Sequence, residues 1–206
     1  MRNTFGVIKM AIRAMTLFVL VALPLMASRA QADVSIEYVR PGMDLNKYSE
    51  FMVSPLDLSD QNVVPPPWAE NNKPHKWVIS EKNISYMRSV YLESISAGLS
   101  ESGKYKVVEH ASANAMLVDI KVVRLTPWAK RGDKSGVTQG SGEIKFEVRL
   151  RDAHTGDLLA LAEGVQNIGK NVQENTRLNH EHNLKEHFHQ WGSTLSNALT
   201  KNQASK

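Results

Sequence analysis

The amino-acid sequence predicts an α+β fold with two layers, in which two helices cover one face of a mixed five-stranded sheet. Two apolar stripes have helical spacing, and Glu143–Asp152 alternates apolar and charged residues. The predicted order is strand–helix–strand–strand–strand–strand–helix. A helix between the first two strands favours a parallel pair, and the closely spaced later strands favour an antiparallel meander. The charged face of Glu143–Asp152 indicates that both helices cover the opposite side.

Residues 1–32 are typical of a secretory signal peptide, because basic residues precede an apolar core and small residues end it. The core, Thr16 to Met26, is shorter than the roughly 20 residues that a membrane-spanning helix needs. We therefore expect cleavage after Ala32, no stable membrane span, and a periplasmic protein made of a single α+β domain, residues 33–206.

The charge balance also depends on this leader. Four of the 25 basic residues lie in residues 1–32, which hold no acidic residue. The rest of the chain therefore has 21 basic and 21 acidic residues and is neutral. A neutral, exported chain makes nucleic acid an unfavourable partner. The chain has no cysteine, which excludes disulfides and thiolate metal sites.

The first half of the chain combines a strand, a loop and a helix. Residues 48–56 contain a short strand pattern, and the polar, proline-rich residues 57–79 predict a loop. Ser80 is a candidate N-cap, and Gly103 ends the helix that follows. The apolar stripe of this helix consists of Ile84, Met87, Tyr91, Ile95 and Leu99.

The second half predicts four strands and a closing helix. The strands are Tyr105–Glu109, Ala115–Leu125, Glu143–Asp152 and Asp157–Val165, with a loop at residues 127–142. Asp152 and Gly156 delimit a turn, because Asp accepts backbone amides and Gly adopts positive φ. The closing helix runs from about Asn183 to Lys201, and its apolar stripe is Leu184, Phe188, Trp191, Leu195 and Leu199.

These segments together resemble a family of Gram-negative envelope proteins known as domain of unknown function 3313. The resemblance rests on the strand and turn from Glu143 to Gly164, the upstream helix followed by YKVVE, and the terminal helix with Phe188 and Trp191. It covers about Lys47 to Leu199 and implies the fold and the envelope compartment, with no activity. Many members are lipoproteins with a cysteine after the signal. The absence of cysteine here implies a periplasmic protein without a lipid anchor.

Four histidines form a candidate zinc or copper site: His180, His182, His187 and His189. Their spacing does not suit a helical site, because no two of them are three or four residues apart. His180 and His182 would chelate together only if residues 180–182 were extended. A polar helix start without a metal is the alternative, and the sequence otherwise calls for no cofactor.

Three tryptophans lie in predicted loops and are candidate ligand-binding residues: Trp68, Trp77 and Trp128. Exposed indoles bind sugars or peptides by stacking. The alternative is that these rings fold back over the sheet and bury their own surface.

Enzyme motifs are absent from the sequence, which has no G-x-S-x-G elbow, P-loop or dinucleotide-binding glycine motif. Gly140-Ser141-Gly142 precedes a strand, which is the wrong context for a phosphate cradle. We expect a non-enzymatic binding or assembly module that presents its open sheet face and two loops to an envelope protein or cell-wall component. The alternatives are a metal-binding protein and a hydrolase of envelope polymers, and an unpaired edge strand would allow homodimers.

Overall fold

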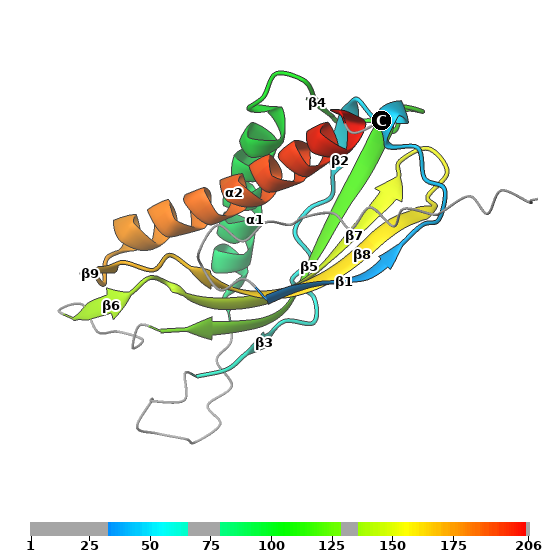
Figure 1. Ribbon diagram of the computed structural model, residues 1–206. Coiled ribbons are helices and arrows are strands. Elements are labelled where there is room, and N and C mark those ends of the chain that lie inside the picture. Colours follow the sequence, from blue (N-terminus) through cyan, green and yellow to red (C-terminus); the bar gives the residue numbers. More distant parts are fainter. Residues whose placement is uncertain (1–32, 66–78, 129–135, 205–206) are drawn as a thin grey trace, which may run out of the picture.

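The computed structural model describes residues 33–65, 79–128 and 136–204 (Figure 1). A strongly bent sheet forms one layer, and the two helices cross each other above one of its faces. This arrangement confirms the α+β class and the mixed sheet. The predicted number of five strands was wrong, because the main sheet has seven strands.

The main sheet consists of β1 (Asp33–Val39), β2 (Glu50–Val53), β3 (Asn62–Val63), β4 (Lys106–Val108), β5 (Ala115–Pro127), β7 (Gly142–Asp152) and β8 (Leu158–Ile168). A separate two-stranded ribbon consists of β6 (Val137–Gln139) and β9 (Val172–Glu174). The helices are η1, a 3-10 turn (Leu45–Lys47), α1 (Glu81–Ser100) and α2 (Arg177–Ala204).

The strand order is β1-β8-β7-β5-β2-β4, with β3 also paired to β5. β2 lies parallel to both β4 and β5, and β5, β7, β8 and β1 follow as antiparallel neighbours. The predicted parallel pair and antiparallel meander are therefore confirmed. β2 and β3 run beside successive parts of β5. Between them, an isolated parallel bridge pairs Asp57 with Lys121 of β5.

The sequence-based prediction missed β1, although Val34, Ile36 and Tyr38 alternate with polar neighbours. β1 is an edge strand with a register shift between Ile36 and Tyr38, and both of these side chains remain 39% exposed. The ribbon strands have three residues each; β6 lies in the segment predicted as a loop, and β9 lies in a polar segment for which no element was predicted. α2 begins at Arg177, earlier than expected, because the Thr176 hydroxyl accepts a hydrogen bond from the Asn179 amide and caps the polar first turn.

The hydrophobic core lies between the helices and the inner face of the sheet. β5 and β7 contribute the alternating residues predicted for them, and both helices direct their predicted stripes toward this core. Phe188 of α2 packs edge-on against Tyr91 of α1 at 5.3 Å, and Trp191 packs on Phe146 of β7 at 4.5 Å. Among the described helices, none has both the length and the apolar character that crossing a membrane requires.

The two helices cross with their backbones in contact, and two glycines make this crossing possible. A Cβ atom on Gly98 of α1 would lie 2.1 Å from the His189 carbonyl oxygen. A Cβ atom on Gly192 of α2 would lie 2.3 Å from the Ile95 carbonyl oxygen. Because both obstacles are backbone atoms, neither can move away without shifting a helix. The lost helix propensity of glycine, about 1 kcal/mol each, is therefore the cost of this close approach.

Substitution of Gly98 by Ala should lower the free energy of unfolding by about 1–3 kcal/mol, because overpacking outweighs the gain in helix propensity. Urea unfolding monitored by circular dichroism measures this loss. Glu93→Ala, on an exposed position of the same helix, is the control and should change stability little. An unchanged or increased stability of Gly98→Ala would contradict the close crossing.

Candidate functional site

The chemically most distinctive region lies where the β6–β9 ribbon meets the start of α2. The ribbon leads into β7 through Gly140 and Ser141, and β9 leads into α2 through Asn175 and Thr176. One end of this region holds an open recess, and the other holds a chain of hydrogen-bonded polar side chains. Both features come from segments adjacent to the ribbon, of which the sequence pattern had assigned residues 127–142 to a loop.

The recess is lined by Trp128, Val137, Thr138 and Gln139 and has a volume of about 310 Å³. Trp128 is half-buried at the end of β5, so its ring lines the recess. Val137 is 74% exposed and Val172, on the same face of the ribbon, is 73% exposed. Apolar side chains that remain this exposed on a short ribbon make it a candidate contact surface.

The polar chain begins at Ser141. The Ser141 Oγ lies 2.8 Å from Nδ1 of His180, and Nε2 of His180 lies 2.7 Å from Oδ1 of Asn175. Nδ2 of Asn183 donates a further hydrogen bond to the Ser141 Oγ at 2.9 Å. We call these four residues the Ser141 cluster. Burial lowers the pKa of His180 below its ordinary value, so the ring is neutral at pH 7.

Glycines hold the backbone around Ser141 in place. Gly140 has φ of +65°, and a Cβ atom there would lie 2.3 Å from the Gly169 carbonyl oxygen. A Cβ atom on Gly169 would in turn lie 2.6 Å from the Asn183 side chain. The β6–β7 and β8–β9 connections therefore pack directly against each other and against α2.

The four predicted metal-binding histidines are not brought together. All four lie within α2. His180 and His182 point to opposite sides of this helix, because residues two positions apart are separated by about 200°. Both ring nitrogens of His180 have hydrogen-bond partners, and His182 is exposed. Within residues 33–65, 79–128 and 136–204, no cluster of three or more His, Asp or Glu side chains is arranged to hold a metal ion.

His187 and His189 have surroundings different from those of His180. The His187 ring packs 4.8 Å from Trp191, and its Nε2 is enclosed without a hydrogen-bond partner. This burial lowers the pKa of His187 to about 4. His189 is half-buried, and its carbonyl oxygen lies at the helix crossing, where it accepts a hydrogen bond from the Ser193 hydroxyl at 3.1 Å.

Of the predicted ligand-binding tryptophans, only Trp128 lies in the described part of the chain. Trp68 and Trp77 lie outside the described residues. The sequence pattern did not single out Ser141, Asn175 and Asn183 as site residues. A serine between two glycines was the only local signal, and no spacing rule connects it to a histidine 39 positions later.

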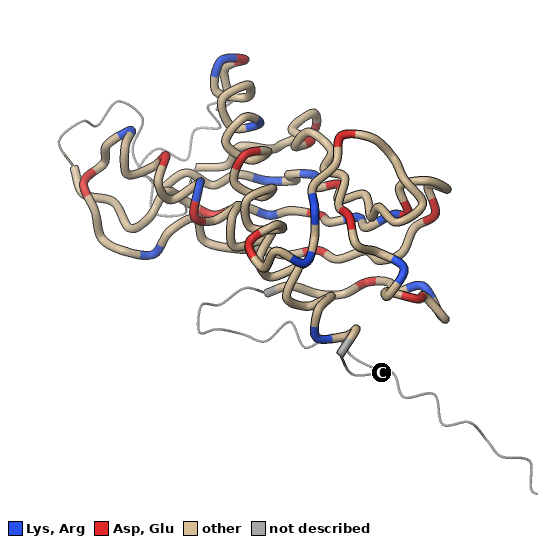
Figure 2. The backbone as a smooth tube through the Cα atoms, turned by 90° about the horizontal axis from the view of Figure 1, so that it is seen from above, with Lys and Arg blue, Asp and Glu red and all other residues tan. Residues whose placement is uncertain are grey.

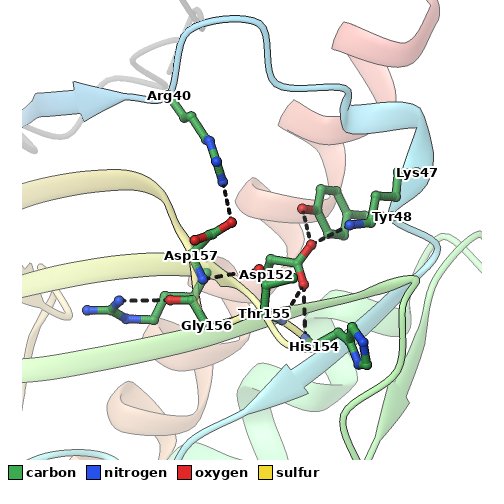
Figure 3. A network of polar contacts seen from close by, with 9 residues as sticks. Arg40, Lys47, Tyr48, Asp152, His154, Thr155, Gly156 and Asp157 are labelled. Carbon is green, nitrogen blue, oxygen red and sulfur yellow. Dashed lines mark hydrogen bonds and ion pairs between the residues drawn. The ribbon is translucent and has the colours of Figure 1, made fainter.

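A second polar network, centred on Asp152, anchors the opposite end of the molecule (Figure 3). The Asp152 carboxylate accepts backbone hydrogen bonds from His154 and Thr155 at 2.9 Å each, as the turn pattern predicts. It also accepts a bond from the Tyr48 hydroxyl at 3.0 Å and pairs with Lys47. The network thus ties the β7–β8 turn to η1.

Asp152 remains charged although it is buried. Burial alone would raise the pKa of this carboxyl, but the Lys47 ammonium and the hydrogen bonds from Thr155, Tyr48 and His154 outweigh it. They hold the pKa of Asp152 well below its usual range. Because every contact of this carboxylate serves the turn or η1, the network has a structural role.

The outer face of the sheet carries charges that largely pair with each other. Arg124 bonds Glu143 at 2.7 Å, Arg149 lies 3.6 Å from Asp119, and Lys145 lies 3.6 Å from Glu163. Each of these ion pairs joins two neighbouring strands of the sheet. Figure 2 shows basic and acidic positions interspersed along the described chain, as expected for a neutral domain. This face therefore offers little unpaired charge to a partner.

The fold and the site define an α+β protein in which a polar side-chain cluster lies close in the chain to an open recess with both apolar and polar lining. The chain belongs to the family described as protein of unknown function (DUF3313), whose model matches residues 24–195. No curated protein matches the chain.

Several solved structures are similar to this chain at low sequence identity. Protein XCC0632 from Xanthomonas campestris is 14% identical, with a TM-score of 0.44, covering 81% of this chain and 93% of its own. The PelC dodecamer from Paraburkholderia phytofirmans is 13% identical, with a TM-score of 0.37, covering 82% and 96%. Lipoprotein GNA1162 from Neisseria meningitidis is 16% identical, with a TM-score of 0.31, covering 63% and 87%.

Replacement of Asp152 by Asn should destabilise the protein by about 2–3 kcal/mol, because the amide lacks the charge that Lys47 and the turn amides contact. Thermal unfolding at pH 7 measures this loss. Asp157→Asn is the matched control: Asp157 lies in the same turn, but its ion pair with Arg40 is exposed to solvent. Equal stability of the two variants would contradict the anchoring role of Asp152.

Stability should fall as the pH is lowered from about 6.5 toward 4, in part because of His187. Its pKa is lower in the folded protein, so the unfolded chain takes up the proton first and acid favours unfolding. The contribution of this group is on the order of 3 kcal/mol, and it levels off below its folded pKa. His187→Phe should flatten the pH dependence measured by urea unfolding. His182→Gln, at an exposed position, should leave the pH dependence unchanged.

Proposed function

We propose that the protein is an exported envelope protein that acts as a binding or assembly module and contacts its partner at the ribbon recess. Residues 1–32 serve as a signal peptide that is removed after Ala32, and residues 33–206 form a single periplasmic domain. The sequence pattern supports this cleavage point, since basic residues precede the apolar core Thr16–Met26 and small residues precede Asp33.

The observation that carries the proposal is the recess with its apolar rim. Trp128 lines it, and Val137 on its rim is largely exposed. An indole beside polar Thr138 and Gln139 suits a peptide segment or a sugar ring, because the flat ring stacks while the polar groups form hydrogen bonds. The sheet face, which the sequence also offered as a contact surface, is less suited because its charges pair internally.

A site-specific crosslink tests this role in the periplasm. A photoreactive phenylalanine analogue at Val137 should form a covalent adduct with one reproducible protein or cell-wall fragment. The same analogue at Leu92, an exposed apolar position of α1, should not form that adduct.

The second arm uses Trp128→Ala in the chain that carries the analogue at Val137. Loss of the stacking ring should reduce the adduct several-fold, because stacking on an aromatic side chain contributes about 1 kcal/mol to binding. Mass spectrometry of the crosslinked product measures the yield. Equal adducts from Val137 and Leu92, or an adduct insensitive to Trp128→Ala, would exclude the recess as the binding site.

A further inference from the structure

We propose that Ser141, His180 and Asn175 form a serine acyl-transfer centre that hydrolyses carboxylic esters. Ser141 would be the nucleophile, His180 the general base, and Asn175 a positioning residue. This inference extends beyond the binding role, because the Ser141 cluster is separate from the side chains that line the recess. Three different segments supply these groups: the β6–β7 turn, the first turns of α2, and the β9–α2 connection.

The geometry meets the requirement for an activated nucleophile. Such a site needs a hydroxyl within hydrogen-bond reach of a base, and a third group that orients the base. The distances of 2.8 Å from Ser141 to His180 and 2.7 Å from His180 to Asn175 satisfy both conditions. An asparagine in the orienting position is known from Cys-His-Asn proteases.

The hydrogen bonds also determine the direction of the proton. The Asn175 Oδ1 can only accept, so Nε2 of His180 carries the hydrogen in the neutral ring. Nδ1 is then an acceptor, and the Ser141 hydroxyl must donate to it. Nδ2 of Asn183 already donates to the Ser141 oxygen, which leaves the hydroxyl hydrogen for His180. In this tautomer the neutral ring can accept the Ser141 proton at Nδ1.

The backbone holds the serine rigidly. Ser141 lies between Gly140 at φ +65° and Gly142 at φ +139°, and a Cβ atom on Gly142 would lie 2.5 Å from the Thr126 carbonyl oxygen. The Ser141 amide donates to the Ile168 carbonyl at 2.6 Å. A nucleophile fixed by its neighbours loses little entropy on reaching the reactive geometry.

The neighbouring recess suggests the class of substrate. Thr138 and Gln139 line the recess, and the chain continues from them through Gly140 into Ser141. The Thr138 hydroxyl donates to the Gly140 carbonyl oxygen at 3.2 Å, which links the recess to the turn. Trp128 and Val137 provide apolar surface, and among the described residues that line the recess none is charged. An uncharged ester with an apolar acyl group fits this lining.

The reaction proceeds in two balanced steps. The Ser141 oxygen bonds to the ester carbonyl carbon while its proton moves to Nδ1 of His180, and the leaving alcohol takes that proton as its C–O bond breaks. Water then attacks the acyl-serine carbonyl and gives a proton to His180. The Ser141 oxygen leaves with that proton, which releases a carboxylic acid and restores the starting state.

An active-site-directed reagent tests the nucleophile in the unmodified protein. A fluorophosphonate probe should add one phosphonyl group per chain, and peptide mass spectrometry should locate it on Ser141. Heat-denatured protein should not react, because the His180 contact is lost on unfolding. The absence of an adduct on folded protein, or an adduct on another residue only, would overturn the proposal.

Hydrolysis of p-nitrophenyl butyrate tests the roles of the three residues. Ser141→Ala should reduce the rate to that of buffer, and His180→Gln should reduce kcat at least ~100-fold. Asn175→Ala should lower kcat more than it raises KM, and Asn175→Asp should restore kcat, which a merely structural residue would not do. Ser59→Ala, an exposed serine that bonds only Asp57 at 2.7 Å through its hydroxyl, is the control and should retain full activity.

Folding is checked by circular dichroism for each variant, and only folded variants are compared. Equal rates for the folded Ser141→Ala variant and the unmodified protein would exclude the centre. If the analogue at Val137 forms no specific adduct but the protein still hydrolyses the ester, only the proposal of a binding site at the recess is overturned. The two proposals therefore fail separately.

Discussion

The backbone contact between the two helices is the constraint on which the rest of the structure depends. Gly98 and Gly192 let α1 and α2 approach very closely. A Cβ atom added to either glycine would lie within 2.3 Å of a carbonyl oxygen of the other helix. The contact fixes the crossing point near the middle of α2, whose 28 residues extend about 42 Å at 1.5 Å per residue. Both ends of the helix are thereby positioned by a feature in its centre.

Each end of α2 completes a different polar network. At its C-terminal end, the Gln203 amide donates to the carbonyl oxygens of Leu45 and Tyr48 at 3.0 and 3.3 Å. Tyr48 also bonds Asp152, so the helix end, η1 and the β7–β8 turn form one anchored unit (Figure 3). At its N-terminal end, His180 and Asn183 reach Ser141. A displaced crossing would therefore separate the base from the nucleophile while the sheet remained intact.

The distribution of charge and apolar surface separates the structural part of the molecule from its contact surface. On the outer face of the sheet, charged side chains pair across neighbouring strands. This face is therefore solvated but presents little net charge to a partner. The β6–β9 ribbon does the opposite, since Val137 and Val172 are exposed beside the Trp128 recess. These exposed valines contribute nothing to the core. Neighbouring exposed apolar side chains of this kind are typical of a contact surface.

The sequence by itself determined the elements whose side chains repeat with a clear period. Both helical stripes, the strands β5 and β7 and the turn at Asp152 follow from local spacing and local hydrogen bonding. The short ribbon could not be predicted, because each of its three-residue strands depends on a partner far along the chain. The alternation of β1 and the Thr176 cap of α2 are local signals that the prediction did not use. Contacts between remote residues likewise decide what surrounds the histidines of α2. Only the tertiary structure decided that His180 meets Ser141 and Asn175, since a hydrogen bond between remote residues leaves no periodic trace in the sequence.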